Sequence, residues 1–153
     1  MSNPNQFPRA RTATSLPGPQ SATSSGKPTI LVVNGDHYVS AIIWTLLKNF
    51  DFDVVSETSG PAGLQLARSL SPDAVVLEVN LPDLNGLEIC RRLRADPATR
   101  ALPVVFCSRQ RYLADEAIEL GAAAFLDGIS GVIQLPACLG NILPARRAAS
   151  SKT

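Results

Sequence analysis

The chain has 153 residues, of which 45% are hydrophobic and 18% charged, a balance that excludes general disorder and allows one domain with a buried core. All 13 acidic residues and eight of the 14 basic ones lie between Asp36 and Asp127, which leaves this central part with a formal charge of −5 between two basic tails. Such an acidic centre is not the charge pattern of a nucleic-acid-binding domain.

Residues 1–27 are rich in Ser, Thr, Pro and Gly. We predict a disordered tail there, because few apolar side chains are present to offset the entropy of ordering. Residues 28–143 form the predicted domain, and residues 144–153 a second disordered tail. In the domain, short apolar runs typical of strands covered on both faces alternate with helical patterns. The predicted strands cover residues 30–33, 53–55, 74–77, 104–107 and 123–126. The predicted helices cover residues 39–47, 61–70, 87–93 and 114–120, and Pro136 begins a short last helix after a Gly-rich loop over residues 127–134.

Five β-α units in strict alternation predict an α/β fold with a five-stranded parallel sheet and helices on both faces, doubly wound and flavodoxin-like. In such a sheet, ligands bind beyond the carboxyl ends of the strands. The residues that follow the predicted strands are Asn34, Gly35, Asp36, Glu57, Glu78, Ser108, Asp127 and Gly128.

Few of these residues offer the chemistry of an enzyme. Glu78 is the single carboxylate at the end of the central strand, and the chain has neither a Gly-rich phosphate loop nor a G-x-S-x-G motif. The single histidine, His37, is interpreted as a surface or capping residue, and Trp44 as a packing residue. We therefore expect a protein that is not an enzyme.

Three cysteines, Cys90, Cys107 and Cys138, form no C-x-x-C pair, so neither a disulfide framework nor a zinc site is expected. Their apolar neighbours indicate buried free thiols in a reducing compartment. The sequence has no stretch that fits a signal peptide or a membrane span. These features predict a cytoplasmic protein without a membrane partner.

From Thr29 to about Leu143 the chain resembles the receiver domain of bacterial response regulators. The similarity lies in the first strand, in the run that leads to the phosphorylation position, and in a loop followed by the third helix. It continues in the fourth strand and in the approach to the fifth. The corresponding segments are residues 30–33, 72–77, 80–88, 103–108 and 121–126.

Three chemical groups of the family are replaced. The two acids that help to hold Mg²⁺ in typical receivers correspond to Asn34 and Gly35, with Asp36 one residue further along. The phosphoacceptor aspartate corresponds to Glu78, and the lysine after the fifth strand to Gly128.

Other family positions are retained. The resemblance assigns Asn80 a backbone carbonyl that faces the metal, Ser108 the switch hydroxyl and Phe125 the aromatic switch position. Arg109 follows Ser108 directly and is long enough to shield the pocket or to pair with Glu78.

The replacements predict a degenerate receiver, or pseudo-receiver, without a cofactor. Loss of two carboxylates removes most of the attraction for Mg²⁺, so its binding is expected to be weak or absent. Glu78 also carries its carboxylate about 1.5 Å further out than an aspartate, one C–C bond. Its single charge either imitates the phosphorylated state in part or leaves the pocket inert.

The resulting hypothesis is a stand-alone signalling protein of the two-component phosphorelay class. It acts without phosphorylation by binding a protein such as a histidine kinase or a downstream regulator. The face between the fourth and fifth helices is the expected contact, and a homodimer through this face is a further option. Two alternatives stay open: an atypical but working phosphoacceptor, and a DNA-binding regulator that uses its basic tails. Nucleic acid is the least expected partner, because no output domain pattern follows residue 143.

Overall fold

Five parallel strands form a single sheet in the order β2-β1-β3-β4-β5, which confirms the predicted α/β fold class. They are β1 (Thr29–Val33), β2 (Asp53–Glu57), β3 (Ala74–Leu77), β4 (Val104–Ser108) and β5 (Ala124–Asp127). The computed structural model describes residues 26–143. Apart from Gly26 and Lys27, the tails predicted at residues 1–27 and 144–153 lie outside the described residues.

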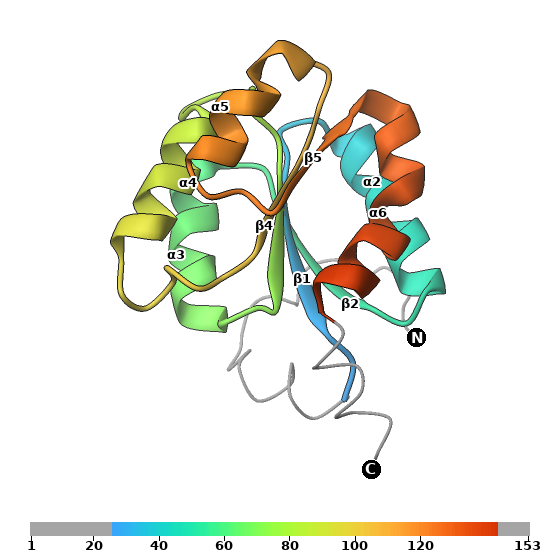
Figure 1. The fold of residues 1–153 in the computed structure, drawn as a ribbon. Coiled ribbons are helices and arrows are strands. Elements are labelled where there is room, and N and C mark those ends of the chain that lie inside the picture. Colours follow the sequence, from blue (N-terminus) through green and yellow to red (C-terminus); the bar gives the residue numbers. More distant parts are fainter. Residues whose placement is uncertain (1–25, 144–153) are drawn as a thin grey trace.

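Helices cover both faces of the sheet (Figure 1). Helices α3, α4 and α5 lie on one face, and α2 and α6 lie side by side on the other. Their bounds are α2 (His37–Asn49), α3 (Gly60–Leu70), α4 (Gly86–Ala95), α5 (Ala114–Glu119) and α6 (Gly128–Ile142), with a short 3-10 turn, η2 (Arg111–Leu113), before α5.

The Val-rich strands are apolar along their whole length because each contributes to two cores. Successive side chains of a strand point to opposite faces. Accordingly, Leu31 and Val75 pack under α3 and α4, whereas Ile30 and Val76 pack under α2 and α6. All four side chains are buried. The sheet is therefore rigid on both sides, and its strand ends are fixed in space.

Side-chain caps begin three of the helices close to the strand ends. Asp36 Oδ1 accepts hydrogen bonds from the N–H groups of Tyr38 (2.9 Å) and Val39 (3.3 Å). In the same way Ser59 caps α3 and Asn85 caps α4. Because these caps satisfy free N–H groups of the first turns, they fix where each helix leaves its strand.

The prediction for the last helix was wrong. Helix α6 begins at Gly128, not at Pro136, and it includes the segment that was predicted as a Gly-rich loop. Buried residues recur with helical spacing through the whole segment, at Val132, Leu135, Pro136 and Leu139. Their burial against the sheet outweighs the cost of an internal proline, which removes one helical hydrogen bond.

The structure tests the predictions for Trp44 and for the three cysteines. Trp44 is not a core residue: its side chain is 46% exposed, and the Lys48 ammonium lies 5.7 Å from the ring centroid. The three cysteines are free thiols as predicted. Cys90 and Cys107 are buried, whereas Cys138, which was also predicted to be buried, is only partly buried. In the described part of the chain, no helix has the length and hydropathy needed to cross a bilayer.

Candidate functional site

The strand order brings the predicted site residues to one edge of the sheet. Strand β1 lies between β2 and β3, and β4 follows β3, so the segments after β1, β3 and β4 are neighbours. The Glu78 N–H donates to the Val33 carbonyl (3.0 Å), which places Glu78 beside Asn34. Ser108 is in register with Asp127, the residue before Gly128. Asn34 and Ser108 are buried there.

The acceptor oxygens at this edge are bound by the backbone of their own loops. Glu78 Oε2 accepts hydrogen bonds from the N–H groups of Val79 (2.7 Å) and Asn80 (3.1 Å). Glu57 repeats the arrangement with the two N–H groups that follow it, at 3.0 and 3.1 Å. Asn34 Oδ1 accepts from the Asp36 N–H (2.8 Å). Each of these side chains therefore closes a local turn with at least one of its oxygens.

The loop after β3 packs over the end of β1. At Gly35, a Cβ atom would lie 2.9 Å from Cδ of the Pro82 ring, so Pro82 lies where a side chain at this position would begin. Asp83 joins the same loop to α3, because its carboxylate accepts from the Gly60 N–H and the Ser59 hydroxyl, both at 3.0 Å. The Gly60 N–H is the main cause of a lowered pKa of Asp83. The loop is thus fixed at two points.

Ser108 and Phe125, the two residues expected to be switch positions, are both engaged in contacts near β4. The Ser108 hydroxyl donates to Gln110 Oε1 (2.8 Å) and accepts from the Gln110 N–H (3.2 Å). The ring of Phe125 stacks on Phe106, with centroids 5.8 Å apart and an interplanar angle of 26°. Because Phe106 is buried in β4, this contact holds Phe125 against the core.

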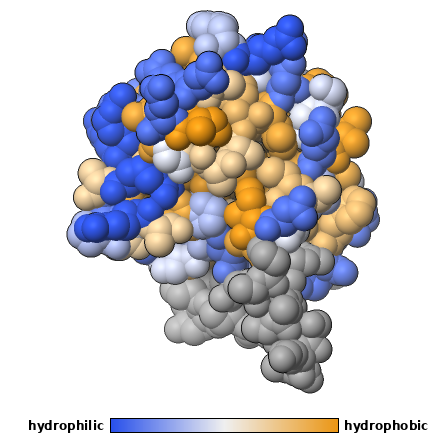
Figure 2. Space-filling view, viewed as in Figure 1, coloured by the Kyte–Doolittle hydropathy of each residue, from blue (hydrophilic) through white to orange (hydrophobic). Residues whose placement is uncertain are grey.

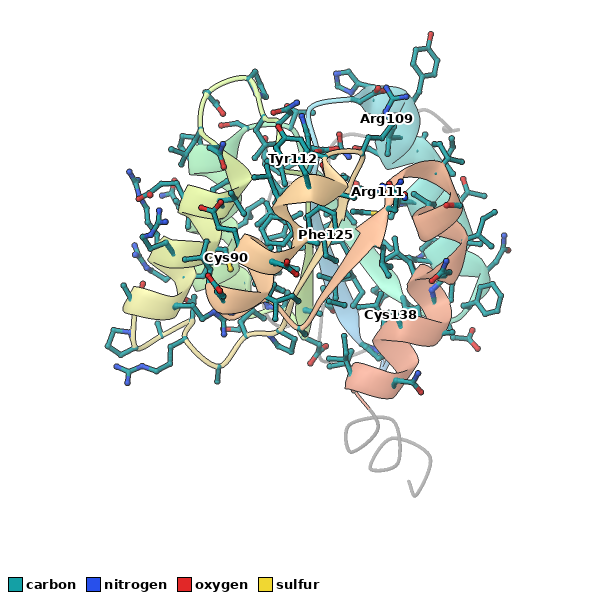
Figure 3. All side chains as sticks on the ribbon, turned by 45° about the horizontal axis from the view of Figure 1, so that its top comes forward. Cys90, Arg109, Arg111, Tyr112, Phe125 and Cys138 are labelled. Carbon is teal, nitrogen blue, oxygen red and sulfur yellow. The ribbon has the colours of Figure 1, made fainter. Side chains whose placement is uncertain are left out.

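Arg109 covers Gly128, the residue that was expected from the sequence to replace a lysine. Its side chain runs over Gly128, where a Cβ atom would meet Arg109 Cγ at 3.3 Å. Gly128 has a φ of +58°, a value that favours glycine. Of the two roles predicted for Arg109, pairing with Glu78 is wrong: none of the ion pairs among residues 26–143 joins them. Nearby, Arg111, which is labelled in Figure 3, pairs with Asp127 at 3.4 Å.

The described residues do not fit a magnesium ion. Mg²⁺ is bound in octahedral geometry with carboxylate ligands, but Gly35 has no side chain, and Asn34 Oδ1 and Glu78 Oε2 each accept a hydrogen bond from a backbone N–H group. Within residues 26–143, no three His, Cys, Asp or Glu side chains form a group that would hold a metal ion.

Sequence reasoning missed three residues that shape this edge. Pro82, Asp83 and Gln110 contact the site residues but belong to loops. A signal for Gln110 exists, since serine hydroxyls often bond the backbone two residues on. Pro82 and Asp83 belong to residues 80–88, which the resemblance marks, but the sequence gives no signal for their partners, because these lie at the ends of other strands.

Comparison with known proteins identifies a family and several relatives that this chain resembles. Residues 30–130 match the response regulator receiver domain family. The protein RcaC of Microchaete diplosiphon is 35% identical over 79 residues, which cover 52% of this chain and 12% of RcaC. The DNA-binding dual master transcriptional regulator RpaA of Synechocystis is 32% identical over 89 residues, which cover 58% of this chain and 37% of RpaA. The chain therefore spans well under half the length of these relatives.

A solved structure extends the comparison to three dimensions. The BeF3-activated N-terminal receiver domain of Klebsiella pneumoniae RstA aligns with a TM-score of 0.64 and 27% sequence identity. The alignment covers 77% of this chain and 97% of that domain. The shared fold covers nearly the whole of that receiver.

Proposed function

The chain belongs to the response regulator receiver family of two-component systems, and from this premise we propose that it signals without phosphorylation, as a protein-binding module and not as an enzyme. The observation that carries the proposal is the carboxylate of Glu78, whose Oε2 accepts two N–H groups from its own loop. An oxygen held in this way is a poor nucleophile for an incoming phosphoryl group.

The chemistry of aspartyl phosphorylation explains why the other replacements support this proposal. Transfer requires a nucleophile in line with the donor, a divalent cation and a fixed positive charge. The Asn34 amide and the Gly35 hydrogen offer no charge to a cation, and Gly128 replaces the lysine. The Ser108 hydroxyl bonds Gln110 instead of facing a phosphoryl oxygen. All of these differences disfavour the transfer of a phosphoryl group to Glu78.

A protein partner, either a histidine kinase or a downstream regulator, is the partner class that the fold supports. The edge strand β5 and the flanking helices α5 and α6 present apolar surface in the middle of Figure 2, whereas the α4 side is hydrophilic. Ile118, which belongs to α5, is 48% exposed. Exposed apolar patches bordered by polar residues are typical of protein interfaces. This α5–β5–α6 surface corresponds to the contact expected from the sequence.

The proposal predicts no response to the ligands that activate ordinary receivers. In an amide NMR titration with Mg²⁺, then with Mg²⁺ and beryllofluoride, we expect no saturable shifts at Asn34 to Asp36, Glu78 or Ser108. The RstA receiver domain, known in a BeF3-activated form, serves as the positive control. Shifts at these residues that saturate at millimolar Mg²⁺ would contradict the proposal.

Phosphate incorporation from acetyl phosphate tests the alternative of an atypical phosphoacceptor. We expect no label on the wild-type chain. Label that disappears in Glu78→Gln would establish the alternative instead. The DNA-binding alternative draws on the printed name of RpaA, but the basic residues on which it depends, such as Arg146 and Arg147, lie outside the described residues. Salt-dependent binding to duplex DNA is its test.

A further inference from the structure

Two Asn-Gly pairs lie at the edge of the sheet that carries the candidate site. Asn34-Gly35 follows β1, and Asn85-Gly86 lies where α4 begins. In such a pair the backbone nitrogen of glycine can attack the side-chain amide carbon of asparagine, because glycine has no Cβ that shields it. The two atoms are held in one short stretch of chain, so a five-membered ring closes without a second molecule. Each pair is therefore a place at which the chain can change its own covalent structure.

In both pairs the asparagine side chain is folded back over the peptide bond that would be attacked. Asn34 Oδ1 accepts a hydrogen bond from the Asp36 N–H at 2.8 Å. Asn85 Oδ1 accepts one from the Leu87 N–H at 2.7 Å. Such a bond to the second residue along is an Asx turn. It brings the amide carbon towards the intervening glycine nitrogen and draws electron density from the carbonyl group. The electrophile is thus prepared at both positions.

The attacking nitrogen is available in only one of the two pairs. The Gly86 N–H donates to the Val79 carbonyl at 2.8 Å, and Gly86 is buried at the start of α4. Attack requires this N–H to lose its proton and to leave a buried hydrogen bond, which is costly. The Gly35 N–H, by contrast, donates no hydrogen bond to any residue of the described range 26–143. Asn34-Gly35 is therefore the reactive pair.

The leaving group of Asn34 has a path to water. Asn34 is only 4% exposed, but its attacker belongs to the same loop and needs no access from outside. Within residues 26–143, Asn34 Nδ2 donates no hydrogen bond, and it is not one of the polar atoms enclosed without a partner. Gly35 is half-buried and Asp36 is exposed. Ammonia can thus leave the loop, and a water molecule can enter it.

We propose that Asn34 is a site of spontaneous deamidation. The Gly35 nitrogen forms a bond to Asn34 Cγ and gives up its proton, the bond from Cγ to Nδ2 breaks, and Nδ2 leaves as ammonia. Water then opens the resulting succinimide ring at either carbonyl group, which yields an aspartate or an isoaspartate. The net reaction consumes one water and releases one ammonia, and it requires no oxidant, metal or cofactor. Asparagine is thermolabile in proteins, and here the structure selects one pair.

The product changes the charge of the candidate site. The Glu78 N–H is bonded to the carbonyl of Val33, the residue before Asn34, so a new carboxylate at position 34 lies beside Glu78 and is repelled by it. An aspartate has the shape of the asparagine that it replaces and needs no repacking. An isoaspartate instead adds a methylene group to the backbone between β1 and α2. Deamidation is thus a one-way change at this edge, beyond the proposed function.

The test is peptide mapping of the full chain by mass spectrometry during incubation in mildly alkaline buffer. Deamidation raises the mass of a peptide by about 1 Da. We expect Asn34 to convert at least roughly tenfold faster than Asn85, which serves as the internal control because it has the same neighbour. In Asn34→Gln the mass change should disappear from this peptide, since the longer side chain does not close a five-membered ring. Circular dichroism verifies that this variant folds.

The chain unfolded in guanidinium chloride shows whether the structure causes the difference. Without the fold, both Asn-Gly pairs have the same freedom, and Asn34 and Asn85 should convert at similar rates. Equal rates in the folded chain would overturn the proposal. It would also be overturned by a folded chain in which Asn34 stays intact over the time in which the unfolded chain converts. Neither measurement uses Mg²⁺, phosphate or a partner protein, so deamidation and the proposed function stand or fall separately.

Discussion

Replacing Gly86 by alanine should lower the free energy of unfolding by about 3 kcal/mol, at the upper end of overpacking effects. Gly86 begins α4 and donates its N–H to the Val79 carbonyl at 2.8 Å. A Cβ at this position would overlap the carbonyl oxygen of Glu78 and lie 2.9 Å from Val79 Cα. These neighbours are backbone atoms, so no side-chain rotation relieves the overlap. The loop that holds Glu78 would have to lift away from the helix.

Gly140→Ala is the control for the loss of a glycine as such. A Cβ at Gly140 meets no atom within 4 Å, and the residue lies inside α6. Alanine there should raise stability by roughly 0.5–1 kcal/mol, because a helical glycine costs more backbone entropy. Urea unfolding of the two variants measures both effects. Equal midpoints for Gly86→Ala and wild type would show that the Glu78 loop does not pack on α4 as described.

The fold was predictable because its main signals are local. Apolar runs such as residues 30–33 and 74–77 are buried on both faces, and the sequence pattern alone indicates this. The last helix was the exception. Pro136 and the glycines of residues 128–131 are local signals against a helix, whereas the burial of Val132 and Leu139 against the sheet is a tertiary effect that these signals do not reveal.

The candidate site was predictable in position but not in its contacts. The strand ends identified Asn34, Glu78 and Ser108, since parallel strands bring their carboxyl ends to one edge. The partners of these side chains depend on how each loop turns. For Glu78, the extra methylene group relative to aspartate gives its carboxylate the reach to bond the N–H groups of Val79 and Asn80. That outcome also requires a side-chain rotamer that the sequence does not specify.

The two glycines of the site, Gly35 and Gly128, also have contacts that the sequence did not predict. From the sequence, Gly35 and Gly128 are losses of charged groups. In the structure, each also makes room for a neighbour, Pro82 in one case and Arg109 in the other. Restoring an aspartate at position 35 would therefore require Pro82 to move. Both positions lie against packed neighbours, so a single substitution to a charged residue at either one should not fit without rearrangement.

At alkaline pH we expect a second large effect on the free energy of unfolding, caused by the Cys107 thiol in β4. Burial first, and then the negative charges of Glu78 and Cys138, together raise the pKa of this thiol to about 12. In the unfolded chain the thiol titrates near its ordinary value of about 8.5 to 9. The folded state therefore keeps a proton that the unfolded state loses. The stability that this group contributes is complete below about pH 9 and decreases as the pH rises towards 12.

Cys107→Ala isolates this effect, because the variant keeps every other titrating group of the chain, including the half-buried Cys138 thiol. One pKa unit corresponds to about 1.4 kcal/mol. The difference in unfolding free energy between wild type and variant should thus change by about 2 kcal/mol between pH 8 and pH 10.5, to the disadvantage of the wild type. Urea unfolding in the presence of a reductant measures it at both pH values. A difference that stays constant would show that the Cys107 thiol titrates normally and that water reaches it through the strand ends.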